Sequence, residues 1–377
     1  MKICRKISNI IMIIAFLLVL TVPTIWFWEI KDTIPPDTSE NRKLAEKPKF
    51  DINTLDNYSD DYEAYYNDNL PFRSFIRNTW TNFNFFVFGE STTNQVLVGK
   101  NDGDLSSSWL FYQENYDGNP IKETQGVYKF TEDEVLNIGK TINTNVKELK
   151  TRNIDLYYAF IPNKANLYRE KLPDNITIFD PSTRVDKLYK VLKQTIEAKD
   201  NLMYLKEDLE KSKDIGQLYF KQDTHWNDLG AFIGFETITK KVSKDSGIDY
   251  TYEVKFSEEE FVDKDLSQMS GIKGTLKDTT PTITYLSDVE FKGMVLETEN
   301  QIVITECEDA KVKKTIMVIG DSFRTPMIPY FAKNYQKVIF LHRCDYGSYM
   351  LDAYAPDIIV CQFLERYVNT VQDFKLY

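Results

Sequence analysis

Residues 315–323 read TIMVIGDSF, an apolar run of mostly β-branched residues that ends in Gly320-Asp321-Ser322. Three similar runs occur elsewhere: IDLYYAFIP at 154–162, KVIFLHR at 337–343 and DIIVCQF at 357–363. Uninterrupted apolar runs of this length are typical of strands covered on both faces, as in parallel sheets. Because segments of loop or helix length separate them, the sequence predicts an α/β fold with a doubly wound, mostly parallel sheet.

The other segments fit this fold class. Apolar spacing of helical period predicts helices in residues 51–90, 131–150, 180–213 and 228–242, and the hairpin pattern of 96–112 places an Asn-Asp-Gly turn between two strands. Residues 250–310 are expected to form short alternating strands and turns.

Composition excludes several classes of function. With 46 Lys or Arg against 57 Asp or Glu, the formal net charge is −11, which does not suit a nucleic-acid partner. There are two histidines, and the four cysteines form no CxxC pair, so zinc and thioredoxin-like sites are not expected. We therefore expect neither a metal nor a cofactor.

The N-terminus predicts a membrane anchor. Residues 7–28 lack any ionisable side chain, are long enough to cross bilayer hydrocarbon, and follow Lys2, Arg5 and Lys6. The positive-inside rule then leaves the N-terminus in the cytoplasm and the rest on the extracytoplasmic face of the cell membrane, with Trp26 and Trp28 at the outer interface. A cleaved signal peptide and a buried core helix are the alternatives. The expected organisation is a tip and anchor at 1–30, a linker arm at 31–50 and one catalytic domain at 51–377.

The strongest chemical motif is Gly320-Asp321-Ser322 at the predicted end of a strand. A serine there lies at the carboxyl edge of a parallel sheet, where backbone N–H groups of a following helix can hold an oxyanion. By itself, a GDS tripeptide is more often an ordinary capped turn. The motif gains meaning only if a base is available.

A candidate base lies in Asp223-Thr224-His225-Trp226. A serine nucleophile needs a base, and an imidazole needs a carboxylate that fixes its tautomer, so Asp-x-His supplies both from one turn. A lone histidine is more often structural, but only two occur in the chain. The other, His342, has no Asp two residues before it and is expected to be structural or peripheral.

These motifs resemble the nucleophile and Asp-His blocks of SGNH hydrolases, but with the Asp-His block before the serine. The inverted order and the spelling DxHW resemble the alginate O-acetyltransferase family, whose SGNH-like domain is circularly permuted. Further segments in the same order support the resemblance: SENRKLAEKPKF (39–50), YNDNLPFR (66–73), GKNDGDLSSSWLFY (99–112), IPNKANLY (161–168), FKQDTHWNDLGAF (220–232), DKDLSQMSGI (263–272) and PDIIVCQFLERYV (356–368).

The resemblance implies roles for individual residues. Ser322 becomes the acyl-accepting nucleophile, His225 the general base and Asp223 its orienting carboxylate. The Glu-Arg pair of the family matches Glu365 and Arg366, which we interpret as structural or supporting the site.

The oxyanion hole is less defined, because the GxND block of SGNH hydrolases is missing. Arg343, Arg366 and Tyr367 are candidates for oxyanion or substrate contacts. A solvated arginine and a core tyrosine are the competing interpretations.

Three hypotheses of function follow. In the first, an anchored O-acetyltransferase receives acetyl from a membrane-bound O-acyltransferase partner and transfers it to a cell-surface or secreted polysaccharide. In the second, the same triad makes the protein a carbohydrate acetyl esterase. In the third, the SGNH-like shape serves a non-catalytic polysaccharide-assembly or binding protein, a reading that intact Asp223, His225 and Ser322 disfavour.

Overall fold

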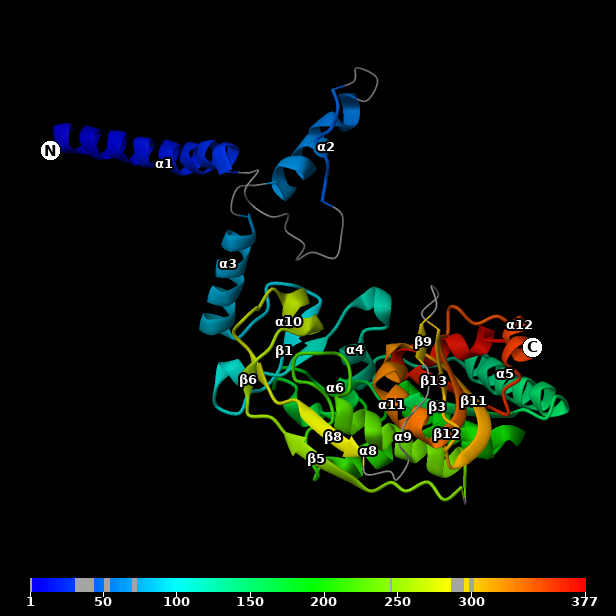
Figure 1. Cartoon of the computed structure of the whole chain (residues 1–377). Helices are drawn as coiled ribbons and strands as arrows, with labels where there is room; N and C mark the ends of the chain where they lie inside the picture. The colour runs from blue at the N-terminus through cyan, green and yellow to red at the C-terminus, as the bar shows by residue number, and fades with distance from the viewer. Residues whose placement is uncertain are drawn as a thin grey trace. The chain divides into compact units, whose positions relative to one another are not determined.

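The computed structural model describes residues 2–30, 44–50, 55–69, 73–244, 246–285, 295–297 and 302–377. The chain divides into two compact units, one formed by residues 1–92 with 268–273 and the other by residues 93–267 with 274–377. Most of the expected linker, residues 31–43, lies outside the described residues. The second unit holds all the residues that the sequence nominates as catalytic, and it is drawn from cyan to red in Figure 1.

The first unit contains the helices α1 (Lys2–Ile30), α2 (Leu55–Asp68) and α3 (Arg73–Phe88). The helices predicted over 7–28 and within 51–90 are thus present. No helix among the described residues combines the length and apolar character needed to cross a membrane, and the predicted span finds no support in them. The side chains of Trp26 and Trp28 lie outside the described ones.

A seven-stranded sheet organises the second unit, with strand order β4-β3-β13-β11-β12-β10-β9. The first five strands run parallel, whereas β10 and β9 add antiparallel pairs at one edge. This confirms the mostly parallel sheet. In sequence order its strands are β3 (Asp155–Ile161), β4 (Leu202–Tyr204), β9 (Val295–Glu297), β10 (Val303–Glu306), β11 (Val312–Gly320), β12 (Tyr335–His342) and β13 (Ile358–Leu364).

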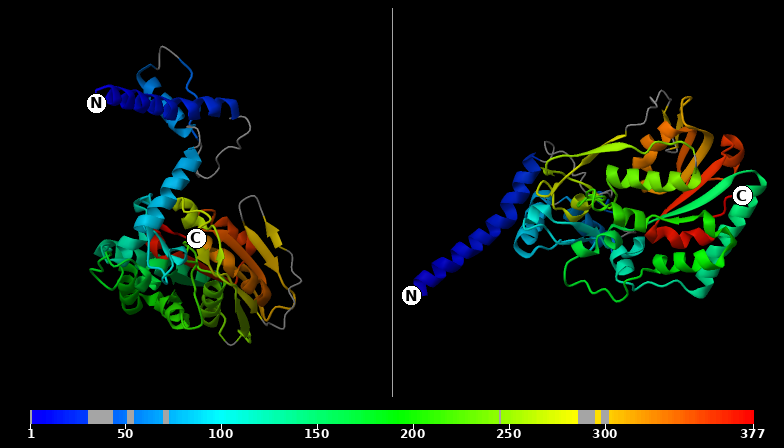
Figure 2. Two further views of the ribbon diagram at one scale, coloured as in Figure 1. Left: turned by 90° about the vertical axis from the view of Figure 1, so that its left-hand side faces the viewer. Right: turned by 90° about the horizontal axis from the view of Figure 1, so that it is seen from below.

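Helices cover both faces of this sheet, as Figure 1 and Figure 2 show. Alternate residues of β11 enter different cores: Ile316 and Val318 join one apolar cluster, and Met317 and Ile319 join the other. The first cluster includes side chains of α6 (Lys164–Leu167), α8 (Lys206–Ser212), α9 (Asp228–Val242) and α11 (Ile328–Asn334). The second includes those of α5 (Glu132–Thr151), α7 (Arg184–Thr195), α12 (Tyr349–Tyr354) and the 3₁₀ helix η8 (Glu365–Asp373). Burial on both faces explains why the strands are uninterrupted runs of apolar residues.

Smaller elements surround this core. The predicted hairpin over 96–112 is confirmed, since β1 and β2 pair antiparallel with Val96 opposite Tyr112. Strand β4 lies inside the segment 180–213 for which only helices are predicted, because three residues are too few to show a strand period. The remaining elements are β1 (Val96–Val98), β2 (Leu110–Tyr112), α4 (Pro120–Thr124), β5 (Tyr252–Phe256), β6 (Glu260–Phe261), α10 (Asp265–Ser270), β7 (Lys277–Asp278) and β8 (Pro281–Tyr285).

Parallel pairing brings four strand ends to one edge of the sheet. Gly320 pairs with His342, and Leu364 pairs with Ile161. The residues that follow each strand, including Ser322, Arg343 and Glu365, are therefore placed along one edge. Functional groups of doubly wound proteins gather at this edge.

Candidate active site

Ser322 is an exposed residue in the first turn of the 3₁₀ helix η7 (Ser322–Met327), just beyond β11. The buried Asp321 holds this turn in place: its carboxylate accepts hydrogen bonds from the backbone N–H of Phe323 (3.0 Å), the backbone N–H of Leu364 (2.8 Å) and the Gln362 amide (2.8 Å). A Cβ at Gly320 would lie 2.2 Å from the Gln362 side-chain oxygen, so a larger residue would have to displace the side chain that donates to Asp321. The GDS motif thus fixes the serine at the sheet edge through its first two residues.

His225 comes from a tight turn that ends at helix α9. Tyr219 and Trp226 form an antiparallel bridge, so the chain doubles back between them. Asn227 caps α9 by accepting a hydrogen bond from the backbone N–H of Gly230 (3.1 Å). Within the turn, the backbone N–H of His225 donates to the carboxylate of Asp223 (3.0 Å). The turn therefore presents both side chains on the same side.

The structure brings the three residues nominated as catalytic into one hydrogen-bonded chain. His225 Nε2 lies 2.6 Å from Ser322 Oγ, and His225 Nδ1 lies 2.7 Å from Asp223 Oδ1. In the neutral imidazole, Nδ1–H donates to Asp223 and Nε2 accepts from the serine hydroxyl. This is the geometry that a serine nucleophile and its base require.

The neighbouring Trp226 ties the two motifs together. Its indole N–H donates to the backbone carbonyl of Phe323 (3.1 Å), and its ring is fully buried. The Phe323 ring lies 4.9 Å from the His225 ring, centroid to centroid. Each motif therefore carries a residue that holds the other in position.

The charges of the pair are set by opposing effects. Burial alone would raise the pKa of Asp223, but the hydrogen bonds and charge of His225 lower it to about 2. Burial alone would lower the pKa of His225, but the hydrogen bond and charge of Asp223 raise it above the ordinary value. The carboxylate thus stays ionised and favours the imidazolium that forms when His225 accepts a proton.

Asp265 is a second carboxylate at this histidine that the sequence reading does not identify. It lies 3.9 Å from His225 Nδ1, and it accepts hydrogen bonds from the backbone N–H (3.1 Å) and hydroxyl (2.8 Å) of Thr224. Burial and the charge of Asp223 raise its pKa to about 6. The segment DKDLSQMSGI contributes to the family resemblance, but no local pattern marks one of its aspartates as a neighbour of His225.

Asp223, His225 and Asp265 are also the group of potential metal ligands found among the described residues, with ligand atoms within 4.8 Å of one another. Their atoms already take part in hydrogen bonds: His225 Nδ1 with the Asp223 carboxylate, and the Asp265 carboxylate with the Thr224 hydroxyl. A cation would have to compete with those hydrogen bonds.

His342 occupies a different environment at the end of β12. Its Nδ1 accepts a hydrogen bond from the backbone N–H of Cys344 (3.3 Å). Burial and the charges of Arg324 and Arg343 lower its pKa. The lowered pKa makes His342 a weaker base than an ordinary histidine, and its structural or peripheral role stays a prediction.

Arg343, Arg366 and Tyr367 form a stacked cluster in which two guanidinium groups lie over one ring. The guanidinium carbons lie 4.6 Å (Arg343) and 5.0 Å (Arg366) from the Tyr367 ring centroid. Arg366 pairs with Asp117 at 3.3 Å, and the Tyr367 hydroxyl donates to the same carboxylate at 2.8 Å. Of the two arginines, Arg343 has no ion pair among the described residues, which leaves its charge available for a ligand.

Glu365 lies on the inner side of this cluster. It is fully buried and accepts hydrogen bonds from the backbone N–H of Asn163 (2.9 Å), the Asn166 amide (2.9 Å) and the Thr183 hydroxyl (2.5 Å). Burial raises the pKa of its carboxyl group. Its contacts fit the supporting role expected of it and fasten the segment that follows β3.

The expectation that backbone N–H groups after Ser322 form the oxyanion hole is wrong for the first two. The N–H of Phe323 donates to the Asp321 carboxylate, and the N–H of Arg324 donates to the Asp321 carbonyl. Within the described part of the chain, the N–H of Ser322 donates to no protein acceptor.

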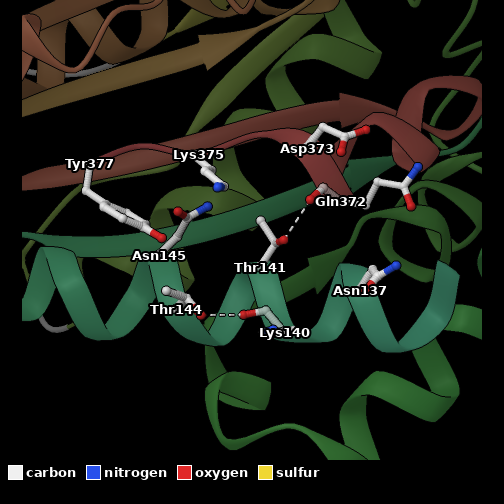
Figure 3. A pocket seen from close by; sticks show the side chains of 9 residues that line it. All are labelled: Asn137, Lys140, Thr141, Thr144, Asn145, Gln372, Asp373, Lys375 and Tyr377. Atoms are coloured by element: carbon white, nitrogen blue, oxygen red, sulfur yellow. Dashed lines mark hydrogen bonds between the residues drawn. The ribbon is translucent and has the colours of Figure 1, made fainter. Parts of the chain in front are cut away.

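A separate polar trough of about 510 Å³ lies between α5 and the C-terminal segment (Figure 3). The Thr141 hydroxyl donates to the Gln372 carbonyl, and the Asn145 amide donates to the Phe374 carbonyl, both at 2.7 Å. These bonds fasten the C-terminal segment to α5. No residue of the Ser-His-Asp chain lines the trough.

The fold and the site together define an α/β protein of the SGNH-hydrolase-like class. The family described as "SGNH hydrolase-like domain, acetyltransferase AlgX" matches residues 102–334. The match covers more than half of the sequence, so the chain belongs to this family.

Named relatives extend the comparison. The probable alginate O-acetylase AlgJ of Pseudomonas aeruginosa is 27% identical over 186 residues, which make up 48% of this chain and 40% of the relative. The protein of the same name from Azotobacter vinelandii is 28% identical over 172 residues, 45% of this chain and 39% of the relative. The chain thus matches about two fifths of the length of these relatives.

Solved structures agree with the fold. Bacillus cereus PatB1 has a TM-score of 0.55 at 18% identity, with 74% of this chain and 100% of that chain covered. A DHHW family protein from Eubacterium siraeum has a TM-score of 0.52 at 13% identity, with 76% and 97% covered. At such identities the likeness concerns the fold alone.

Proposed function

We propose that this protein is an O-acetyltransferase that modifies a polysaccharide through an acetyl-Ser322 intermediate. The observation that carries the proposal is the continuous hydrogen-bonded chain Ser322–His225–Asp223, in which the hydroxyl is exposed and 2.6 Å from its base. The names of the alginate O-acetylase relatives support acetyl transfer to a polysaccharide as the reaction class.

In the first half-reaction, His225 Nε2 takes the proton of Ser322 Oγ while the oxygen attacks the acetyl carbonyl of the donor. Asp223 stabilises the imidazolium, which then protonates the leaving group of the donor. In the second half-reaction, His225 deprotonates a sugar hydroxyl, which attacks the acetyl-serine, and the serine oxygen leaves with the returned proton. The free serine hydroxyl and the neutral imidazole are thereby regenerated.

The developing oxyanion needs donors. The uncommitted N–H of Ser322 is one candidate. The guanidinium of Arg343 is the other, because it follows the strand beside β11, its backbone N–H donates to the Gly320 carbonyl (2.9 Å), and its charge is unpaired among the described residues. Arg366 and Tyr367, which share Asp117, are better suited to contact the acceptor.

The donor and location complete the proposal. A membrane-bound O-acyltransferase partner would deliver acetyl groups to an extracytoplasmic site. The sequence pattern of residues 2–28, basic residues followed by an uncharged apolar run, supports this location. Protease treatment of intact cells should digest residues 51–377 and leave an N-terminal tag protected; protection of the whole chain would contradict it.

One product assay tests the reaction. With an acetyl donor and an oligosaccharide acceptor, we expect an acetylated sugar from the unmodified protein and none from Ser322→Ala, whose fold should be unchanged by circular dichroism. Release of acetate alone would identify an esterase. Acetylation that persists in Ser322→Ala would overturn the proposal.

A further inference from the structure

Lys164 is a buried cation that the proposed reaction does not use. It begins the short helix α6 and is 5% exposed. Its ammonium lies 5.2 Å from the Phe111 ring centroid and 6.0 Å from that of Trp109, both buried rings. Lysine is rarely buried without a strong compensating set of partners. The partners it has are therefore informative.

All three N–H donors of Lys164 go to backbone carbonyls of the turn that carries Asp223 and His225. The ammonium lies 3.1 Å from the Phe220 oxygen, 3.1 Å from the Lys221 oxygen and 2.6 Å from the Asp223 oxygen. A lysine ammonium has three donors and no acceptor, so its capacity is fully used. The carbonyl of Lys221 has a second donor in the backbone N–H of Leu110 (2.9 Å).

Three carbonyl dipoles that converge on one point repel each other unless a cation lies between them. Lys164 supplies this cation, and thereby stabilises the one backbone conformation that points Asp223 and His225 toward Ser322. No direct ion pair of Lys164 is found within the described residues, although the carboxylates of Asp265, Asp223 and Asp278 face it at longer range. The nearby Lys221 ammonium is paired with Glu259 (2.7 Å).

We propose that Lys164 is a positioning residue of the Ser-His-Asp site, which clamps the 220–223 backbone and keeps a positive charge behind Asp223. The inference rests on the proposed function. Its action is indirect: it touches neither the serine nor the imidazole, and works through the turn and through the field at Asp223.

The charge has a measurable effect. Burial lowers the pKa of Lys164 to about 8, against the opposing charges of Asp265, Asp223 and Asp278. Above that pH the neutral amine has two donors for three carbonyls. The reactivity of Ser322 should therefore fall as pH rises through about 8, because the turn loses its alignment. It should also fall at acid pH, where His225 is protonated and cannot act as a base.

The test is the rate at which a fluorophosphonate probe labels Ser322 in the full chain, measured from pH 5 to 10. The unmodified protein should give a bell-shaped profile. Lys164→Met keeps the length of the side chain but removes charge and donors, so we expect labelling about 10- to 100-fold slower. Its acid limb should move to higher pH, because the lost positive charge leaves the imidazolium more stable.

Two further variants separate positioning from general stability. Lys164→Arg stays charged throughout this range, so it should keep the acid limb, regain most of the rate and lose the basic limb. Lys213→Met is the matched control. Its ammonium also caps a carbonyl, that of Leu167 at 2.9 Å, lies over an aromatic ring and pairs with Glu170 (2.6 Å). Among the described residues it has no hydrogen bond or ion pair to the 220–226 turn. Its pH profile should equal that of the unmodified protein.

Each outcome decides a different question. The positioning role would be overturned if Lys164→Met were labelled at the same rate, and with the same pH profile, as the unmodified protein. If Lys164→Met does not fold, a basic limb that persists in Lys164→Arg overturns it instead. Failure of the folded, unmodified chain to label at Ser322 at any pH would overturn the proposed function itself.

Discussion

The two histidines of the chain both lie at the edge where the parallel strands end, yet their surroundings differ in sign. His225 faces the carboxylates of Asp223 and Asp265, and its pKa is raised. Burial is the main cause that lowers the pKa of His342, and the charges of Arg324 and Arg343 add to it against those of Asp345 and Asp321. Position at the functional edge is therefore not enough to make a base. His225 differs in having a carboxylate hydrogen-bonded to its ring, which outweighs its burial.

The largest expected difference comes from removing each imidazole. His225→Ala should slow fluorophosphonate labelling of Ser322 by about 10³- to 10⁴-fold, because the serine loses its base. His342→Ala should change the rate by no more than about twofold, as substitutions away from a site usually do. Equal losses in both variants would remove the distinction between the two histidines.

The next largest difference is expected between substitutions of the two carboxylates next to His225. Asp223→Asn should lower the labelling rate by about 10³- to 10⁴-fold, because the amide no longer fixes the tautomer and leaves the imidazolium uncompensated. Asp265→Asn should cost less than about tenfold, since its carboxylate acts at 3.9 Å and through Thr224. A larger loss in Asp265→Asn would reassign the orienting role.

A smaller effect concerns pH. The base must be neutral, so the labelling rate should rise as pH increases through the raised pKa of His225, above the usual 6.5. Asp265→Asn removes a negative charge and should move this limb to lower pH. A limb that stays in place would show that Asp265 is already protonated there.

The smallest effect is on stability. A raised folded-state pKa means that His225 stabilises the fold below pH 6.5, a contribution lost as pH rises through the folded pKa. The lowered pKa of His342 has the opposite sign: stability falls as pH drops below 6.5. Thermal unfolding of His225→Gln and His342→Gln between pH 5 and 8 should therefore show opposite changes of slope.

The sequence predicts those catalytic residues that lie together in short contiguous motifs. Asp223 and His225 share one turn, and Ser322 follows a strand whose apolar run is unmistakable. The meeting of these strand ends at one edge also follows, because parallel strands end together.

The site residues that the sequence does not predict are distant in sequence from the residues that they contact. Asp265 reaches Thr224 from 41 residues away, and Lys164 reaches the Asp223 carbonyl from 59 residues away. Nothing in IPNKANLY distinguishes a buried lysine from a solvated one, because burial depends on Trp109 and Phe111 from another segment. Two of the expected oxyanion donors are lost for a related reason: the Asp321 carboxylate turns inward and accepts the Phe323 N–H, and the Asp321 carbonyl accepts the Arg324 N–H.

The inward turn of Asp321 also limits which changes the neighbouring strand can tolerate. Its carboxylate joins the nucleophile turn to Gln362 and Leu364 of β13, the strand that leads into Arg366 and Tyr367. Substitutions that shift the end of β13 would therefore displace the serine as well. Arg343, which follows β12 on the other side, is joined to the same turn by its backbone N–H, which donates to the Gly320 carbonyl (2.9 Å). The nucleophile turn is therefore connected to the ends of both neighbouring strands.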